Sequence, residues 1–290
     1  MTERVPWTAW PGQRFELGEG ARVFDGRLSV VDILSGRLFE LPGDGAAGPR
    51  LLVSLEEPLG AVAKLAGGGW IAAAGTGIAV LGENGTVRWL ARPEDGATTP
   101  MRMNDGVADP GGRFWAGSMA CDGTSGAGSV YRVGTEGTVR RVLDGYTVPN
   151  GPAFTADGAT MYLADSAEGI IYRFAVDPDT GDPGEREVFA TVEGASPDGM
   201  TVDAEGFLWS AMWGGGEVRR YAPDGELAER LPVPVTQPTS VCLTGERLVV
   251  TSATVGLAEP GDLDGAVLSA PCATPGVEDR QARIAIPLDR

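Results

Sequence analysis

The sequence predicts an all-β fold, a six-bladed β-propeller with four antiparallel strands per blade around a central metal-binding channel. Three observations support this: a strand-and-turn pattern that recurs six times, an abundance of turn residues, and no convincing helical periodicity. The 290 residues include 44 Gly and 21 Pro, yet 42% of the chain is hydrophobic. This combination is typical of a folded protein with many short strands joined by turns.

The repeat is visible in short apolar strands that begin roughly 44 residues apart, the length of one propeller blade. These strands occupy residues 27–32, 70–74, 113–117, 161–165, 207–211 and 248–252. A further strand follows in several units, at 128–133, 169–174 and 216–221. Asn-Gly and Asp-Gly pairs, as at Asn84-Gly85 and Asp157-Gly158, supply the positive φ angles of tight turns between them.

Six such units in one ring predict a single domain over residues 1–290. A blade cannot bury both of its faces alone, so neighbouring blades must stack and the ring must close. We expect the stretch at 15–23 to supply a strand to the last blade near 284–288. That closure would protect the free sheet edges.

The charge of the chain limits its partners. The formal net charge is −17 and the pI is near 4.4. Nucleic acids and anionic membranes bind proteins through Lys and Arg, so we expect neither as a partner. A field of this sign would draw cations toward a cleft lined by carboxylates.

The chain contains no histidine. This excludes Ser-His-Asp and Cys-His catalysis, histidine general bases and the usual histidine-containing zinc sites. A metal ion in this protein must therefore be held largely by oxygen atoms from Asp, Glu, Asn or water.

The cysteines and the lack of long apolar segments indicate the cellular compartment of the protein. Cys121, Cys242 and Cys272 are odd in number and widely spaced, which does not suggest a disulfide framework. Residues 1–10 lack an apolar core of signal-peptide length, and no run is long enough to span a membrane. We expect a cytoplasmic protein that is a monomer or a weak dimer.

Four distinctive segments follow one another about one blade apart. They are Arg102-Met103-Asn104-Asp105-Gly106 with the sequence up to 119, Pro149-Asn150-Gly151-Pro152, Ser196-Pro197-Asp198-Gly199-Met200, and Gln237-Pro238-Thr239-Ser240. Together they resemble the regucalcin (senescence marker protein) and gluconolactonase family of six-bladed propellers, over about 17–252. The N-terminal match is weaker, because Gly18-Glu19-Gly20 keeps the family's glutamate without its following Pro and Trp.

The resemblance implies one divalent metal ion held by Glu19, Asn150 and Asp198, with waters in the remaining positions. Two carboxylates and an amide oxygen suit a hard cation, so Ca²⁺ is the first expectation, with Zn²⁺, Mn²⁺ and Mg²⁺ as alternatives. The resemblance also assigns Arg102, Asn104 and Asp122 to substrate binding. Because residues two apart in an extended segment point to the same side, Arg102 and Asn104 should both face the channel.

The function implied is hydrolysis of a small lactone, a sugar-acid lactone such as gluconolactone. In this hypothesis the metal polarises the carbonyl and activates water, with Asp198 as the general base. Two other functions stay open. One is a metal-dependent esterase, a phosphotriesterase or a biosynthetic ring-modifying enzyme on the same scaffold. The other is a non-catalytic calcium- or ligand-binding propeller.

Each candidate residue also has an ordinary structural interpretation. An Asn or Asp before Gly is usually a turn residue, and a lone Glu is usually a solvated charge. Arg102 could pair with a neighbouring carboxylate. Trp115 and Trp209 are expected in the packing between blades, whereas Trp213 is a candidate for the channel mouth.

Overall fold

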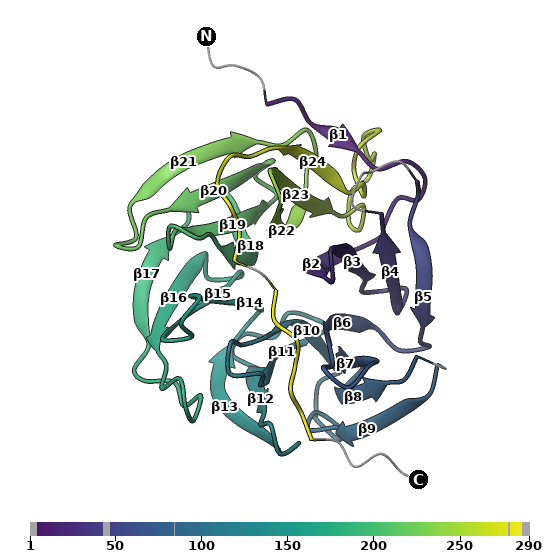
Figure 1. The fold of residues 1–290 in the computed structure, drawn as a ribbon, viewed down its shortest axis with the longest axis vertical. Coiled ribbons are helices and arrows are strands. Elements are labelled where there is room, and N and C mark those ends of the chain that lie inside the picture. Colours follow the sequence, from purple (N-terminus) through teal and green to yellow (C-terminus); the bar gives the residue numbers. More distant parts are fainter. Residues whose placement is uncertain (1–4, 43–46, 84, 278, 286–290) are drawn as a thin grey trace.

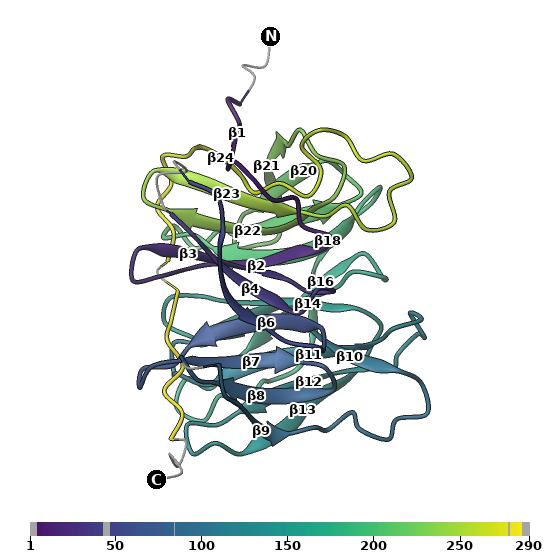
Figure 2. The same cartoon turned by 90° about the vertical axis from the view of Figure 1, so that its right-hand side faces the viewer.

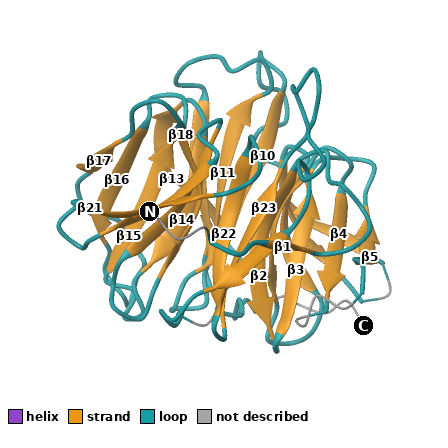
Figure 3. Ribbon diagram, turned by 90° about the horizontal axis from the view of Figure 1, so that it is seen from above, coloured by secondary structure: helices purple, strands orange, loops and turns teal. Residues whose placement is uncertain are grey.

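A computed structural model describes residues 5–42, 47–83, 85–277 and 279–285. Six four-stranded antiparallel sheets are arranged as blades around a central axis (Figure 1), confirming the predicted fold class. Strands and loops account for the described part of the chain (Figure 3), which contains no helix that could cross a bilayer.

Each blade has an inner strand beside the channel and a second strand that pairs with it. The inner strands are β2 (Gly18–Phe24), β6 (Leu59–Lys64), β10 (Met101–Ala108), β14 (Pro149–Phe154), β18 (Ser196–Val202) and β22 (Pro238–Thr244). The second strands are β3 (Arg27–Asp32), β7 (Trp70–Ala74), β11 (Phe114–Ala120), β15 (Thr160–Asp165), β19 (Leu208–Trp213) and β23 (Arg247–Ser252). The second strands are the six repeats found in the sequence.

Two further strands complete each blade toward the outside (Figure 1), and Figure 2 shows the same blades from the side. The third strands are β4 (Arg37–Leu41), β8 (Gly77–Leu81), β12 (Gly128–Val133), β16 (Ile170–Ala175), β20 (Glu217–Tyr221) and β24 (Leu268–Pro271). The outer strands are β5 (Arg50–Ser54), β9 (Val87–Ala91), β13 (Val139–Tyr146), β17 (Glu187–Thr191), β21 (Leu227–Pro232) and β1 (Thr8–Ala9). Inner strands are almost wholly buried and outer strands such as β21 are mostly exposed, as stacking between blades requires.

The ring closes through different residues from those predicted. The N-terminal segment does complete the last blade, but its strand is β1, which pairs with Leu268 and Ser269 of β24. The predicted closing stretch instead runs into β2, the inner strand of the first blade. Ile284 and Ala285 lie outside the last blade, and 286–288 lie outside the described residues. The amide of Ala285 donates to Thr135 in the third blade.

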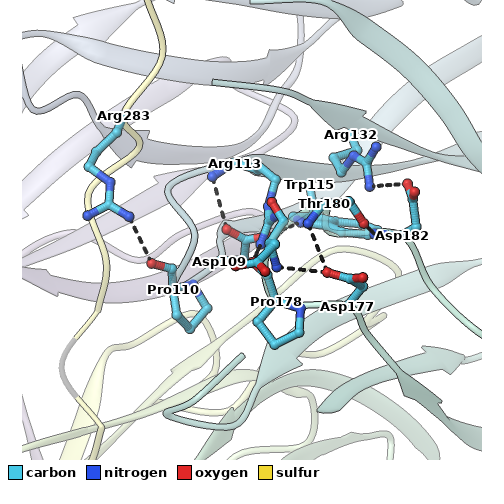
Figure 4. A network of polar contacts seen from close by, with 11 residues as sticks. Asp109, Pro110, Arg113, Trp115, Arg132, Asp177, Pro178, Thr180, Asp182 and Arg283 are labelled. Carbon is cyan, nitrogen blue, oxygen red and sulfur yellow. Dashed lines mark hydrogen bonds and ion pairs between the residues drawn. The ribbon is translucent and has the colours of Figure 1, made fainter. Parts of the chain in front are cut away.

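Two buried aspartates anchor the turns between inner and second strands, each through an indole and an arginine. We call these the Asp–Trp–Arg clamps. Asp109 Oδ2 accepts from Trp115 Nε1 at 2.9 Å and from Arg113 Nε at 2.6 Å (Figure 4). Asp203 Oδ2 accepts in the same way from Trp209 Nε1 at 2.8 Å and Arg220 Nη2 at 2.7 Å. Trp115 and Trp209 are thus packing residues, as expected.

A C-terminal segment crosses one end of the channel. This C-terminal strap, 275–277 with 279–285, is the yellow trace across the centre of Figure 1. Its hydrogen bonds reach four blades, because Pro275 bonds Ala204, Asp279 bonds Val23, Ala282 bonds Lys64, and Arg283 bonds Gly112. These contacts lie beyond or near the ends of the inner strands. The strap therefore covers the end of the channel where the inner strands finish.

Candidate metal and substrate site

Every inner strand is irregular near its beginning. The register between inner and second strands shifts after Glu19, Leu59, Met103, Asn150, Pro197 and Pro238. A bulge of this kind re-aims the side chains beside it. The positive φ angles of Gly20 (58°) and Gly151 (81°) permit two of these irregularities without strain on a side chain.

Each inner strand has one residue at, or directly after, the last pair before its register shift: Glu19, Gly60, Asn104, Asn150, Asp198 and Thr239. Four of them carry polar side chains that line one cavity. Gly60 has no side chain, and a Cβ there would lie 2.1 Å from the carbonyl oxygen of Asn104. Thr239 donates its hydroxyl hydrogen bond to the carbonyl oxygen of Gly18. The second and sixth blades therefore contribute nothing comparable.

The cavity has a volume of about 270 Å³ and lies at the end where the inner strands begin, opposite the C-terminal strap. Its lining residues are Leu17, Glu19, Ile33, Arg102, Asn104, Met119, Val148, Asn150, Ser166, Ala167, Ser196, Asp198 and Trp213. The structure thus brings together five of the six predicted site residues. Trp213 also lies here, as the sequence suggested.

The predicted metal ligands are buried side by side. Glu19, Asn150 and Asp198 are each at most 5% exposed. Burial and the charge of Asp105 raise the pKa of Glu19 to about 8. Burial and the neighbouring Glu19 raise the pKa of Asp198 well above its usual value. Two buried carboxyl groups in contact cannot both ionise cheaply unless a cation joins them.

The donor set fits a hard divalent cation. Glu19 and Asp198 supply two carboxylates, and Asn150 Oδ1 supplies a neutral oxygen with one lone pair in use. No group of three Cys, Asp or Glu side chains in the described segments forms a metal cluster, so the amide is needed to complete the set. The ligands of a bound cation would therefore be Glu19, Asn150 and Asp198, the three residues that the sequence predicts.

A relay of hydrogen bonds fixes the amide side chains. Arg102 Nη1 donates to Asn104 Oδ1 at 2.6 Å, and Asn104 Nδ2 donates to Asn150 Oδ1 at 3.0 Å. Asn150 Nδ2 then donates to Ser166 Oγ at 2.8 Å, and Ser166 donates to the Pro197 carbonyl at 2.5 Å. The relay connects three blades. It orients Asn150 and brings Arg102 and Asn104 to the same side, as their spacing predicts.

Asp122 is placed differently. It is exposed in the loop after β11, where its carboxylate accepts from the amide and the hydroxyl of Thr124 at 3.0 and 2.6 Å. It is absent from the cavity lining. Its contact with substrate remains a prediction from the sequence resemblance.

Two charged residues beneath the cavity were not identified from the sequence as part of the site. Asp105 Oδ1 accepts from Gly106 N at 2.7 Å, and Oδ2 accepts from Gly151 N at 3.0 Å, so this carboxylate joins two inner strands. Arg22 is 3% exposed, and its Nε lies 3.8 Å from Oδ1 of Asp279 in the C-terminal strap. Their position in the channel depends on the bulges, for which the sequence carries no local signal beyond the glycines.

Comparison with known proteins agrees with this architecture. Residues 17–254 match the family described as the SMP-30/gluconolactonase/LRE-like region. The chain belongs to this family.

The relatives include enzymes and a calcium-binding protein. The chain is 38% identical to a 6-deoxy-6-sulfogluconolactonase of Pseudomonas putida over 76% of each chain. It is 38% identical to a pentonolactonase of Haloferax volcanii, over 86% of this chain and 84% of the relative. The crystal structure of a calcium-binding protein, regucalcin from Agrobacterium tumefaciens, superposes with a TM-score of 0.88 at 30% identity, covering 97% of this chain and 98% of that one.

Proposed function

We propose that this protein is a metal-dependent lactonase that hydrolyses the ring ester of a small lactone, of the sugar-acid type on which its named relatives act. The observation that supports this best is the cavity floor. Two buried carboxylates with raised pKa values lie beside an oriented amide, and Arg102 lies next to them. A bare ion site would not need the arginine.

Glu19, Asn150 and Asp198 would hold the cation. When bound, a divalent cation supplies Lewis-acid polarisation of an ester carbonyl and makes a nearby water more acidic. We expect Ca²⁺ first, because the donors are all oxygen.

The side chains of this protein perform the remaining steps. Asp198 is the proposed general base, which would take the proton from the attacking water and return it to the ring oxygen as the ring C–O bond of the lactone breaks. Arg102 offers guanidinium N–H groups at the cavity and orients the substrate ring. The described part of the strap covers the far end of the channel, so we expect substrate and water to enter from the cavity side.

The test is removal and return of the metal. The protein is stripped with a chelator, and Ca²⁺, Mg²⁺, Mn²⁺ and Zn²⁺ are added back singly. Acid release is followed from sugar lactones, simple γ- and δ-lactones and aryl esters. We expect lactone opening that depends on metal and is lost in Asp198→Asn. Tight metal binding without turnover of any lactone or ester would contradict the proposal and favour a binding role.

A further inference from the structure

The cavity has two layers along the inner strands. The metal-site residues form the floor. Side chains two positions earlier, in the same strands or in the residue directly before them, should lie one layer nearer the opening, because alternate residues of an extended segment share a face. Leu17, Arg102, Val148 and Ser196 stand two positions before Glu19, Asn104, Asn150 and Asp198, respectively, and all of them line the cavity. Two of these four upper side chains are apolar.

Other elements extend the apolar part of the wall. Ile33 follows β3, Met119 lies on β11, and Trp213 ends β19. With Leu17 and Val148 they form what we call the apolar collar. Its members come from blades on different sides of the channel, so the collar surrounds the upper cavity rather than forming a patch on one wall.

Few polar groups remain for a substrate. Asn104 uses its amide group to bond the Pro149 carbonyl, Asn150 and Arg102. The hydroxyl hydrogen of Ser166 is committed to the Pro197 carbonyl. Outside the proposed metal ligands, the lining donors left over are the other N–H groups of Arg102, the Ser196 hydroxyl and the indole N–H of Trp213.

A fully hydroxylated sugar lactone would bring several hydroxyl groups against this collar. Each hydroxyl that loses water and finds no partner costs free energy comparable to a lost hydrogen bond. An alkyl or deoxy substituent in the same place would instead remove apolar surface from water. The balance therefore depends on how many hydroxyl groups the substrate carries.

We propose that the apolar collar selects lactones with an alkyl or deoxy substituent and few free hydroxyl groups over fully hydroxylated aldonolactones. The ring ester lies at the floor, and the substituent lies among Leu17, Ile33, Met119, Val148 and Trp213. This inference rests on the proposed lactonase function. Within the lactones, it moves the preferred substrate from the fully hydroxylated sugar-acid type of the named relatives toward deoxy and alkyl lactones.

The experiment compares matched lactones on the metal-loaded protein. Glucono-δ-lactone is paired with δ-hexalactone, and arabinono-γ-lactone with γ-hexalactone, so that ring size is constant within a pair. Each kcat/KM is divided by the hydroxide-catalysed rate of the same lactone, which removes differences in intrinsic reactivity. We expect the alkyl lactone of each pair to be favoured by about tenfold, the discrimination that apolar pockets commonly reach.

Variants then test whether the collar causes the preference. Met119→Gln with Val148→Thr places polar atoms in the collar, and Val148→Thr alone is a milder version. Val142→Thr, at a half-buried position on the outer strand β13, is the matched control. We expect the double variant to reduce the alkyl preference about tenfold by raising KM for alkyl lactones, and the control to leave it unchanged.

The outcomes separate the two proposals. Equal or better normalised turnover of the hydroxylated lactones would overturn the collar inference and leave the lactonase function standing. An alkyl preference that is unchanged in both collar variants would also overturn the role of the collar. Absence of turnover for every lactone, with metal bound, would overturn the proposed function itself.

Discussion

The carboxylates of the channel and those of the Asp–Trp–Arg clamps are equally buried but differ in their partners. Asp203 accepts from an indole and an arginine, and Asp109 does the same. Glu19 and Asp198 have each other and backbone amides, and their pKa values are raised. Asp109 and Asp203 each bond their own arginine, so removing either partner leaves a buried charge without compensation. A pair of buried carboxyl groups with raised pKa values has instead the electrostatics of a metal site.

The largest expected effect separates these two sets. Asp198→Asn should lower kcat/KM by about a thousandfold or more and abolish tight metal binding, because it removes a proposed metal ligand that is also the proposed base. Asp203→Asn is the matched substitution in a clamp. It should cost about 3 kcal/mol of unfolding free energy and leave the folded enzyme active. Calorimetric metal titration and denaturant unfolding measure both. Loss of metal binding in Asp203→Asn would break the distinction.

Asp105 shares features with both sets of carboxylates. Like the clamp residues it has hydrogen bonds within the fold, to backbone amides of two inner strands, and it lies near the proposed metal site. Asp105→Asn loses the charge and one of its two acceptors. We expect about a tenfold fall in kcat and weaker metal binding, with the lactone KM little changed. A stability loss with unchanged metal affinity would assign Asp105 to the scaffold.

Arg102→Ala should raise the lactone KM about tenfold and leave the metal bound, because the arginine lines the cavity, where we propose that it orients the substrate, and supports Asn104 through one hydrogen bond. Arg102→Lys, which keeps the charge and loses the planar fork, is the control. Equal loss of metal in Arg102→Ala and Asp198→Asn would contradict the division between substrate and metal residues.

The pH dependence of stability tests whether the channel carboxyl groups are strained without a metal ion. The pKa of Glu19 is raised from 4.5 to about 8 in the folded protein. Its protonated form therefore favours folding, and this contribution is lost as pH rises from about 5 through 8. We expect the melting temperature of the metal-free protein to fall over that range, and added metal to suppress the fall. A similar fall in metal-free Glu19→Gln would assign it to other groups.

The smallest effect is expected at Asp122. Its carboxylate is exposed and bonded to Thr124, so Asp122→Ala should change kcat/KM by less than about twofold, as for most surface substitutions. Steady-state kinetics on the preferred lactone measure this. A tenfold rise in KM would restore the substrate contact that the family resemblance suggests.

Local signals explain what the sequence could predict. The strands at 70–74 and 128–133 are recovered with their bounds, because apolar runs and adjoining glycines define them. The prediction of which residues close the ring was wrong. The closing strand β1 has only two residues, and its partner β24 lies at the other end of the chain. Asn150-Gly151 reads as a turn by local rules, yet it lies in an inner strand, where the pairing of β14 with β15 determines its geometry.

The proposed metal ligands were predicted from the pattern of a family, whereas the layers of side chains around them were not predicted. The positions of Leu17 and Val148 two residues before ligands become informative only once the inner strands are known to surround one channel. The burial of Arg22 against Asp279 depends on a strap that returns from the far end of the sequence. Such contacts have no signature within a short window.

The C-terminal strap also affects how substrate enters and product leaves the channel. Because the strap covers the far end of the channel, we expect the lactone to enter and its ring-opened acid to leave through the same cavity opening. The lactone is neutral and feels little of a net charge of −17, whereas the acid leaves as an anion and is repelled by it. Hydrolysis therefore gives the molecule a charge on which the electrostatic field of the protein acts, and we expect the net negative charge to favour departure of the acid from the cavity opening.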